Sequence, residues 1–250
     1  MPIFIRGDDV EYGLRNMKHL ILMNGICVWH EPFENKYSSF LEYYIMRNQL
    51  IDNSFHCEWY GAKQVNRAIF GHCMREIMFY RYKNVELYLR GIRDFLKGPQ
   101  WLMEQDGEQL HKNVMAAGYR GIELEKLDVP FNYPVYDDSI RRGDTRKQKI
   151  KRCLTFNGLF LPAKGTNVVP MSAARPVLFY RKKKVMQYDV TGKKAFVTEK
   201  RVGTSIKYIF KTLGVMCVIP FKIKKAQQAY RTDGLKLRTL EFWREFLALG

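Results

Sequence analysis

Long apolar runs are missing from this sequence. Its 250 residues contain no continuous stretch of about 18 apolar side chains, the length that a transmembrane helix needs. The candidates at 19–29 and 213–221 are shorter and are broken by Asn24, Gly25 or Gly214. Acidic residues begin at position 8, which is not typical of a secretory signal. We therefore expect neither an ordinary transmembrane helix nor a leader peptide.

Cysteine pairs, internal repeats and low-complexity tracts are missing as well. The five cysteines are widely scattered and never spaced as CxxC, which argues against a disulfide framework or a zinc knuckle. The pairs His56-Cys57 and His72-Cys73 indicate zinc only weakly, because neighbouring side chains on a helix point about 100° apart. We expect reduced thiols in a cytoplasmic protein. The hydrophobic content of 46% is enough for a folded core and excludes disorder.

Acidic charge is scarce in the second half of the chain. Residues 1–125 hold 15 Lys and Arg against 16 Asp and Glu, whereas residues 126–250 hold 27 against 9. The net charge of +17 therefore comes from the second half. Such an asymmetry predicts an anionic partner for that half. Nucleic acid, an acidic membrane surface and a ligand that carries a diphosphate all qualify.

The region 38–120 has a helical pattern. A capping-box spacing from Ser39 to Glu42 precedes a helical period, and further helices are predicted at 62–82, 85–97 and within 101–117. Gly98-Pro99 predicts the end of the third of these helices. Upstream, Asn24-Gly25 between two apolar runs predicts a tight turn.

The pattern changes after residue 125. Residues 126–150 carry two prolines, few aliphatic side chains and a charge run, and we predict a linker or long loop there. The elements predicted beyond it are short strands at 153–161, 177–180, 185–190 and 195–198, and helices at 207–212 and 235–249. We therefore expect an α+β protein with a helical region at 61–125 and a small, basic, β-rich C-terminal domain with a terminal helix at 151–250.

Three carboxylates, Asp8, Asp9 and Glu11, lie within four positions before a predicted helix. They cannot all lie on one helix face, and adjacent carboxylates repel each other unless a cation or a donor lies between them. A structural explanation is a helix N-terminus, where acidic side chains cap the helix and complement its dipole. A functional explanation is a site for acid–base chemistry, and the spacing leaves both explanations open.

Three motifs, in this order, resemble those of family-2 glycosyltransferases of the bacterial galactofuranosyltransferase type. They are Asp8-Asp9-x-Glu11-Tyr12-Gly13-x-Arg15, Val28-Trp29-His30 and Tyr43-Tyr44-x-x-Arg47-Asn48-x-Leu50. The resemblance is dense over 4–51 and looser downstream, where Asn157-Gly158-Leu159-Phe160-Leu161-Pro162 and the basic hairpins are similar. It implies that residues 1–60 form the C-terminal part of a GT-A-like catalytic domain.

The resemblance implies inverting transfer of a sugar, galactofuranose from UDP-galactofuranose, to a hydroxyl of a cell-surface glycan or its lipid-linked precursor. Asp9 would be the general base that takes the acceptor proton, and Asp8 would orient the acceptor. His30 would bind Mn²⁺ or Mg²⁺, which neutralises the leaving diphosphate. The residues expected to contact substrate are Glu11, Trp29 and Arg47.

These side chains also have structural explanations. Trp29 could fill the core, and a lone His30 at the end of an apolar segment could be structural. Arg47 could pair with a nearby carboxylate, while Asn48 satisfies backbone groups.

The donor-binding half of such enzymes has no counterpart in these 250 residues. The sequence contains no Asp-x-Asp motif, no glycine-rich phosphate loop and no dinucleotide fingerprint. We therefore expect this chain to be the C-terminal part of a transferase and to be inactive alone. The missing donor-binding half is a candidate partner chain.

Basic clusters at 181–184, 193–194, 200–201 and 222–225 are candidates for one surface. Each basic residue near an anionic leaflet contributes about 1 kcal/mol, so about five or six would hold the protein peripherally at the inner face of a membrane. Nucleic acid is the weaker alternative, because aromatics are not interleaved with these charges and no known binding motif occurs. A solvated surface without a partner also fits.

Overall fold

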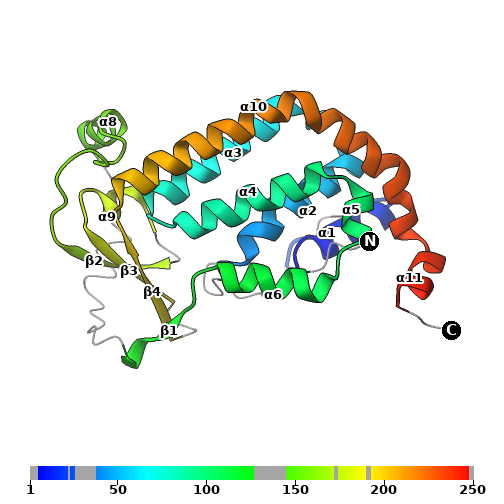
Figure 1. Ribbon diagram of the computed structural model, residues 1–250, viewed down its shortest axis with the longest axis horizontal. Helices are drawn as coiled ribbons and strands as arrows, with labels where there is room; N and C mark the ends of the chain where they lie inside the picture. The colour runs from blue at the N-terminus through cyan, green and yellow to red at the C-terminus, as the bar shows by residue number, and fades with distance from the viewer. Residues whose placement is uncertain are drawn as a thin grey trace.

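The chain forms a helical bundle with a small sheet at one end (Figure 1). A computed structural model describes residues 5–21, 23–25, 38–126, 145–171, 174–189 and 193–247. The helices are α1 (Asp8–Asn16), α2 (Leu41–His56), α3 (Ala62–Met78), α4 (Tyr82–Leu96), α5 (Pro99–Met103), α6 (Gly107–Ala117), α8 (Arg146–Leu154), α9 (Pro176–Phe179), α10 (Val202–Thr232) and α11 (Leu240–Phe246), with 3-10 turns η2 (Leu124–Lys126) and η4 (Asp233–Arg238). The strands are β1 (Ile122–Glu123), β2 (Thr166–Pro170), β3 (Lys184–Asp189) and β4 (Lys194–Glu199).

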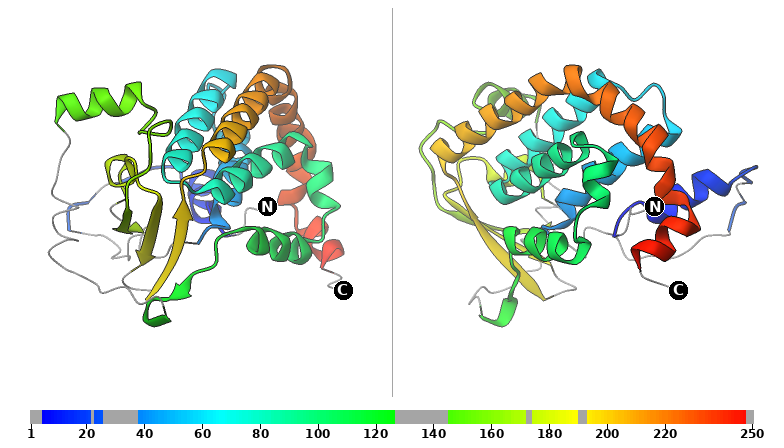
Figure 2. Two further views of the ribbon diagram at one scale, coloured as in Figure 1. Left: turned by 60° about the vertical axis from the view of Figure 1, so that its left-hand side comes forward. Right: turned by 45° about the vertical axis from the view of Figure 1, so that its right-hand side comes forward.

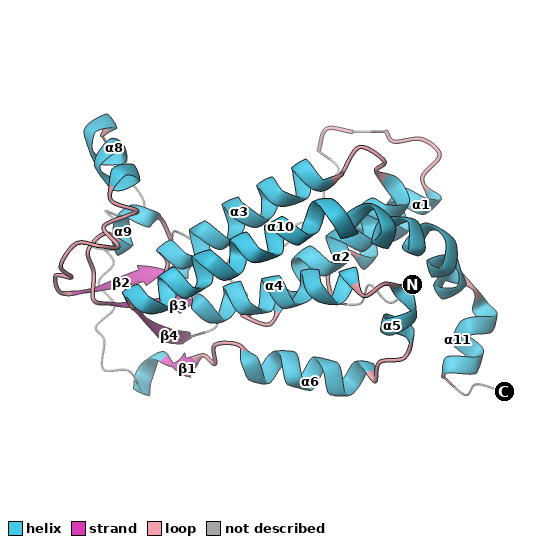
Figure 3. Ribbon diagram, turned by 45° about the horizontal axis from the view of Figure 1, so that its top comes forward, coloured by secondary structure: helices cyan, strands magenta, loops and turns pink. Residues whose placement is uncertain are grey.

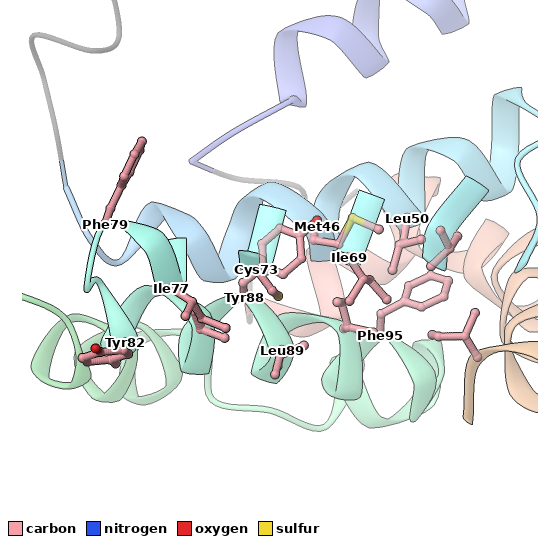
Figure 4. Packing of buried hydrophobic residues seen from close by; sticks show 14 of the residues in the cluster. Met46, Leu50, Ile69, Cys73, Ile77, Phe79, Tyr82, Tyr88, Leu89 and Phe95 are labelled. Atoms are coloured by element: carbon pink, nitrogen blue, oxygen red, sulfur yellow. The ribbon is translucent and has the colours of Figure 1, made fainter. Parts of the chain in front are cut away.

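The main core lies between α2, α3, α4 and α10. The buried apolar residues of α3 are Val65, Ile69, Cys73 and Ile77, and their spacing of four places them on one face of the helix. Figure 4 shows side chains of α2, α3 and α4 gathered in this core, among them Ile69 and Phe95. The ring of Phe95 on α4 stacks on Tyr230 of α10, with 4.8 Å between the ring centroids. The helices predicted within 38–120 are therefore confirmed, with α2, α3 and α4 forming the bundle.

Helices α2 and α4 lie very close together at Gly91. A Cβ atom at this position would lie 2.2 Å from the carbonyl oxygen of Tyr43 and 3.4 Å from the Cβ of Arg47. Real Cβ atoms essentially never lie closer than 3.0 Å to another heavy atom. A residue without a side chain is therefore required at this crossing.

Helix α10 contains a proline, Pro220, in its interior. Proline has no N–H, so the carbonyl of Met216, four residues earlier, loses its helical partner. Asn66 on α3 supplies a replacement, because its Nδ2 donates to that carbonyl oxygen at 3.1 Å. This contact with a neighbouring helix compensates for the proline, and α10 runs through it with a total length of 31 residues.

The sheet has the strand order β1-β4-β3-β2, with β2 and β3 parallel and the other pairs antiparallel. Val169 and Val185 from β2 and β3 belong to the same buried cluster as the bundle residues. Gln187 on β3 accepts a hydrogen bond from Arg81 at the start of α4 and donates to Thr198 on β4 at 2.8 Å. Figure 2 shows the sheet at one end of the bundle and α11 at the other.

Part of the predicted C-terminal secondary structure was wrong. Residues 153–161, predicted as a strand, include the end of α8 and a turn in which Phe156, Asn157 and Gly158 have φ values of 47, 54 and 72°. Residues 177–180, also predicted as a strand, lie largely in α9, because Pro176 presets the first helical φ. The strands predicted at 185–190 and 195–198 are confirmed as β3 and β4.

Helix, not strand, dominates the described part of 151–250, so the expectation of a β-rich domain needs correction (Figure 3). The helix predicted at 207–212 is confirmed but extends over all of α10. Instead of one helix at 235–249, the chain forms η4 followed by α11. Helix α8 also begins at Arg146, inside the predicted linker. The described architecture is α+β, and one buried cluster joins α2–α4 with the sheet and α10.

We expected no helix able to span a membrane, but one helix of the structure is long and apolar enough to do so, judged by its length and composition alone. The helical segment Val202–Leu237 reaches a mean hydropathy of 1.4, and 17% of its most apolar window is buried. A run broken by Gly214 and Pro220 therefore still has a high average hydropathy. Because little of this window is buried, α10 presents much apolar surface outward.

The capping box predicted from Ser39 to Glu42 does not form. Helix α2 begins after Phe40 without a side-chain cap. Ser39 Oγ instead donates to Asn84 Oδ1 on α4 at 2.6 Å, and Glu42 Oε2 lies 2.6 Å from His72 Nε2 on α3. Both side chains link helices because they are buried in the bundle.

Candidate acidic site on α1

Asp8 and Asp9 lie in the first turn of α1 and are exposed. Gly7 precedes them with φ 87°, a left-handed conformation that glycine adopts without strain, and no side chain caps the helix. The carboxylates are therefore placed where the helix dipole favours negative charge. Their exposure leaves them accessible to a substrate hydroxyl.

Glu11, the third carboxylate, is buried and has a different role. Its Oε2 lies 3.7 Å from Arg15 Nε, and its Oε1 lies 3.5 Å from His56 Nε2 at the end of α2. With 3% of its surface exposed, Glu11 holds α1 against α2, and its predicted contact with substrate stays a prediction. The structure thus separates the acidic motif into two exposed carboxylates and one that docks the helix.

A second anchor lies just before α1. Asn48 Nδ2 on α2 donates to the backbone carbonyl of Arg6 at 2.7 Å. Arg47 Nε in turn donates to Asn48 Oδ1 at 3.0 Å, which fixes the orientation of the amide. Asn48 therefore satisfies a backbone group two residues before Asp8.

Arg47 contacts tyrosines rather than the acidic pair within the described part of the chain. Its guanidinium carbon lies 5.0 Å from the ring centre of Tyr43 and 4.8 Å from that of Tyr44, within cation–π range. Tyr43 donates to Asp94 Oδ2 on α4 at 2.9 Å. Burial raises the pKa of Tyr43, with Arg47 opposing and Asp94 adding to the rise. Tyr43 is thus a neutral donor, and Arg47 is a positioning residue for Asn48.

A cavity of about 200 Å³ lies next to this anchor. Its lining includes Ile5, Tyr44 and Arg47, together with His111 on α6 and Trp243 on α11. Tyr44 Oη and His111 Nδ1 lie 2.9 Å apart, so polar groups and aromatic rings meet there. Aromatic faces beside hydrogen-bonding groups suit a sugar ring.

Trp29 and His30 lie outside the described residues, so the metal site that the resemblance implies has no described histidine. Among the described residues, three metal-ligating side chains come close together at Glu42, His72 and Glu76, in a group that includes neither Asp8 nor Asp9. Glu76 already contacts Arg75 Nε at 3.2 Å, Arg81 Nη1 at 3.7 Å and Asn84 Nδ2 at 2.8 Å. This cluster is a charge-balanced network between α2, α3 and α4.

Sequence reasoning missed this network. Its signal was present, because His72 and Glu76 are four residues apart and share one face of α3. Glu42 could not be assigned to it, since the partner of His72 is 30 positions away. The adjacent pairs His56-Cys57 and His72-Cys73 indicated zinc only weakly; in the structure His56 faces Glu11 and Cys73 lies in the core.

Comparison with known proteins links part of the chain to glycosyltransferases. It is 29% identical over 124 residues to the galactofuranosyltransferase GlfT2 of Mycobacterium tuberculosis, covering 45% of this chain and 19% of that protein. It is 30% identical over 108 residues to GlfT2 of Mycolicibacterium smegmatis, covering 40% of this chain and 16% of that protein. The chain thus spans less than a fifth of the length of these curated relatives. No protein-family model matches.

Proposed function

We propose that this chain supplies the acceptor side of an inverting glycosyltransferase. The supporting observation is the exposed pair Asp8 and Asp9 at the start of α1, in a chain partly similar to a galactofuranosyltransferase. In this proposal Asp9 is the general base and Asp8 orients the acceptor hydroxyl. A base within hydrogen-bond reach accelerates such a step about 10²–10⁴-fold.

The anchors of α1 give this proposal a physical basis. A catalytic base must be held within a few tenths of an ångström of its productive position. Glu11 and Asn48 fix the two sides of the Asp8-Asp9 turn to α2, a helix of the bundle core. We propose that the cavity beside Arg47 and Trp243 takes the acceptor sugar, with UDP-galactofuranose as donor and a glycan or lipid-linked glycan as acceptor.

The residues that would bind the donor and its Mn²⁺ or Mg²⁺ are not among those that the structure describes. No Asp-x-Asp occurs in the 250 residues, so we expect the chain alone to show no transfer. The test is a chimera in which this chain replaces the matched segment of the M. tuberculosis relative, assayed for transfer from UDP-galactofuranose. Activity that falls at least about 100-fold in Asp9→Asn supports the proposal. The exposed Glu108→Gln on α6 is the matched control. A folded chimera without activity, or an Asp9→Asn chimera with full activity, would contradict it.

Our second proposal is peripheral binding to an anionic membrane, which the outer face of α10 supports. Large apolar side chains are exposed along it at a spacing of three to four from position 202 to 213, and again eight positions later at 221, which places them on one stripe. We define the α10 stripe as Val202, Ile206, Phe210, Leu213 and Phe221, with Phe210 and Phe221 being 68% and 87% exposed.

Lysines border this stripe. Lys207, Lys222, Lys224 and Lys225 are exposed on the same helix. An apolar stripe with flanking lysines is typical of a helix that lies in the interface of an anionic bilayer. The opposite face of α10 is packed on α3 and α4 through Ile219, Ile223 and Tyr230, which favours a helix that lies on the membrane over one that crosses it.

The test is sedimentation with phosphatidylcholine vesicles with and without phosphatidylglycerol. We expect binding that needs the anionic lipid, weakens with salt and is lost in Phe210→Ser/Phe221→Ser. Leu20→Ser, an exposed apolar side chain before α2, is the control. If the double variant instead changes the oligomeric state in light scattering, the stripe is an interface between copies. The cytoplasmic, membrane-peripheral location belongs to this proposal.

A further inference from the structure

An apolar cavity of about 470 Å³ lies between α3, α8 and α10, away from the acidic site. Its walls include Met74 and Ile77 of α3, Leu159 after α8 and Ile209 of α10. Phe70 and Phe156, 47% and 56% exposed, also line it. The volume lies within the range of small-molecule sites, and the open aromatic side chains give it an entrance.

Three polar groups of α8 and the turn after it face this apolar space. Lys149 and Arg152 line the cavity and are three residues apart on α8, so they share one face. The third is Asn157, which is 4% exposed. Its Nδ2 donates to the carbonyl of Pro176 at 2.7 Å, which fixes the amide orientation. Its Oδ1 is buried and accepts no hydrogen bond within the described part of the chain. A buried acceptor without a donor is costly, so a ligand that brings an O–H would be stabilised there.

One wall of the cavity belongs to α10, the helix that also carries the α10 stripe. Ile209, in the cavity wall, is followed directly by Phe210 of the stripe. The cavity and the stripe therefore share one helix, which brings a site for a hydrocarbon chain close in the fold to an exposed apolar surface. Charge complementarity at Lys149 and Arg152 selects an anionic head group, and the apolar walls select a hydrocarbon chain.

We infer that this cavity binds one hydrocarbon chain of an anionic membrane lipid, with the head group at Lys149 and Arg152 and a hydroxyl of that head group donating to Asn157 Oδ1. Phosphatidylglycerol has this chemistry: a phosphate, two hydroxyls and acyl chains. The apolar walls replace the hydrocarbon surroundings that the chain has in the bilayer, so its move into the cavity exposes no additional apolar surface to water. The inference does not depend on the transferase proposal, because no α1 residue takes part.

The experiment measures binding of a short-chain phosphatidylglycerol, below its micelle concentration, by calorimetry and native mass spectrometry. We expect one lipid per chain. Phe70→Ala and Lys149→Glu should each weaken binding about threefold to tenfold, since the first removes an entrance contact and the second reverses a charge. The matched controls are Phe160→Ala and Lys147→Glu, whose side chains are exposed but do not line the cavity.

A second arm identifies the source of the ligand. Phosphatidylglycerol vesicles should compete with the fluorescent fatty acid cis-parinaric acid for the same site, and the Phe70→Ala variant should bind both ligands more weakly by the same factor. Absence of saturable binding by the folded chain would overturn the inference, as would equal binding by the cavity variants and their controls. Binding of the free acid that vesicles cannot displace would overturn the assignment to a membrane lipid.

Discussion

Replacing Gly91 by alanine tests whether the α2–α4 crossing supports the acidic site. The added Cβ would lie 2.2 Å from the Tyr43 carbonyl oxygen, at least 0.8 Å closer than the 3.0 Å limit of real contacts. Because the obstructing atom belongs to the backbone of α2, no side chain can rotate away. The two helices must therefore separate, which is an overpacking cost of about 3 kcal/mol.

Part of this cost is offset by helix propensity. Alanine is favoured over glycine inside a helix by about 1 kcal/mol, so we expect a net destabilisation of about 2 kcal/mol. For a chain of this size that lowers the melting temperature by about 4–8 °C. The measurement is urea and thermal unfolding followed by circular dichroism.

The matched control is Gly71→Ala, on the exposed side of α3. A Cβ there meets nothing within 4 Å, so the variant should gain up to about 1 kcal/mol from propensity alone. Gly91→Ala should also speed amide exchange in residues 8–16, because Asn48 and Arg47 follow Tyr43 on α2. If Gly91→Ala is as stable as Gly71→Ala, the close crossing of α2 and α4 is wrong.

The further predictions concern Asn66, Cys73 and Asn48. Asn66→Ala should lower the free energy of unfolding by about 1–2 kcal/mol. In a Pro220→Ala background this loss should be about 1 kcal/mol smaller, because the new N–H at position 220 satisfies the same carbonyl. Additive losses in urea unfolding would argue against the replacement bond. Burial raises the pKa of Cys73 to about 12, so in native buffer at pH 8 it should resist alkylation while the exposed Cys217 reacts, and equal labelling by mass spectrometry would refute its burial. The unfolded thiol loses its proton near pH 8.5. The stability that the buried neutral thiol contributes should therefore be complete below that pH and decline as pH rises toward 12. Cys73→Ser, which lacks the thiol, should lose less stability than the parent chain over this pH range. Asn48→Ala should cost about 1–3 kcal/mol and raise amide exchange in α1, and unchanged protection of α1 would contradict its anchoring role.

The bundle helices could be predicted because their period is local. The apolar spacing in α3 and the stop at Gly98-Pro99 are visible in sequence and need no tertiary contact. The failure at 153–161 has a local cause too: three successive residues with positive φ cannot continue a strand, and Asn157-Gly158 was the signal for that turn. The extent of α10 could not be predicted, since Pro220 is tolerated through the bond from Asn66 to the carbonyl of Met216, two residues that are 150 positions apart along the chain.

The same division applies to the acidic site. Sequence identified Asp8, Asp9 and Glu11 as a group, but it could not assign their different environments. Glu11 is buried because His56 meets it from 45 positions away, and the turn before Asp8 is held by an amide 42 positions away. Partners at such separations are created by the packing of α1 on α2, which no local pattern encodes.

These contacts make the geometry of the site depend on the packing of the bundle. Gly91 lets α4 approach α2, and α2 then presents Asn48 and His56 to the segment that contains α1. An isolated helix as short as α1 is marginal in water, so it gains its stability from these contacts rather than from its own sequence. The orientation of Asp8 and Asp9 therefore depends on the bundle core. It follows that a change at Gly91, distant in sequence from the carboxylates, should impair them more than a surface change within α1 itself.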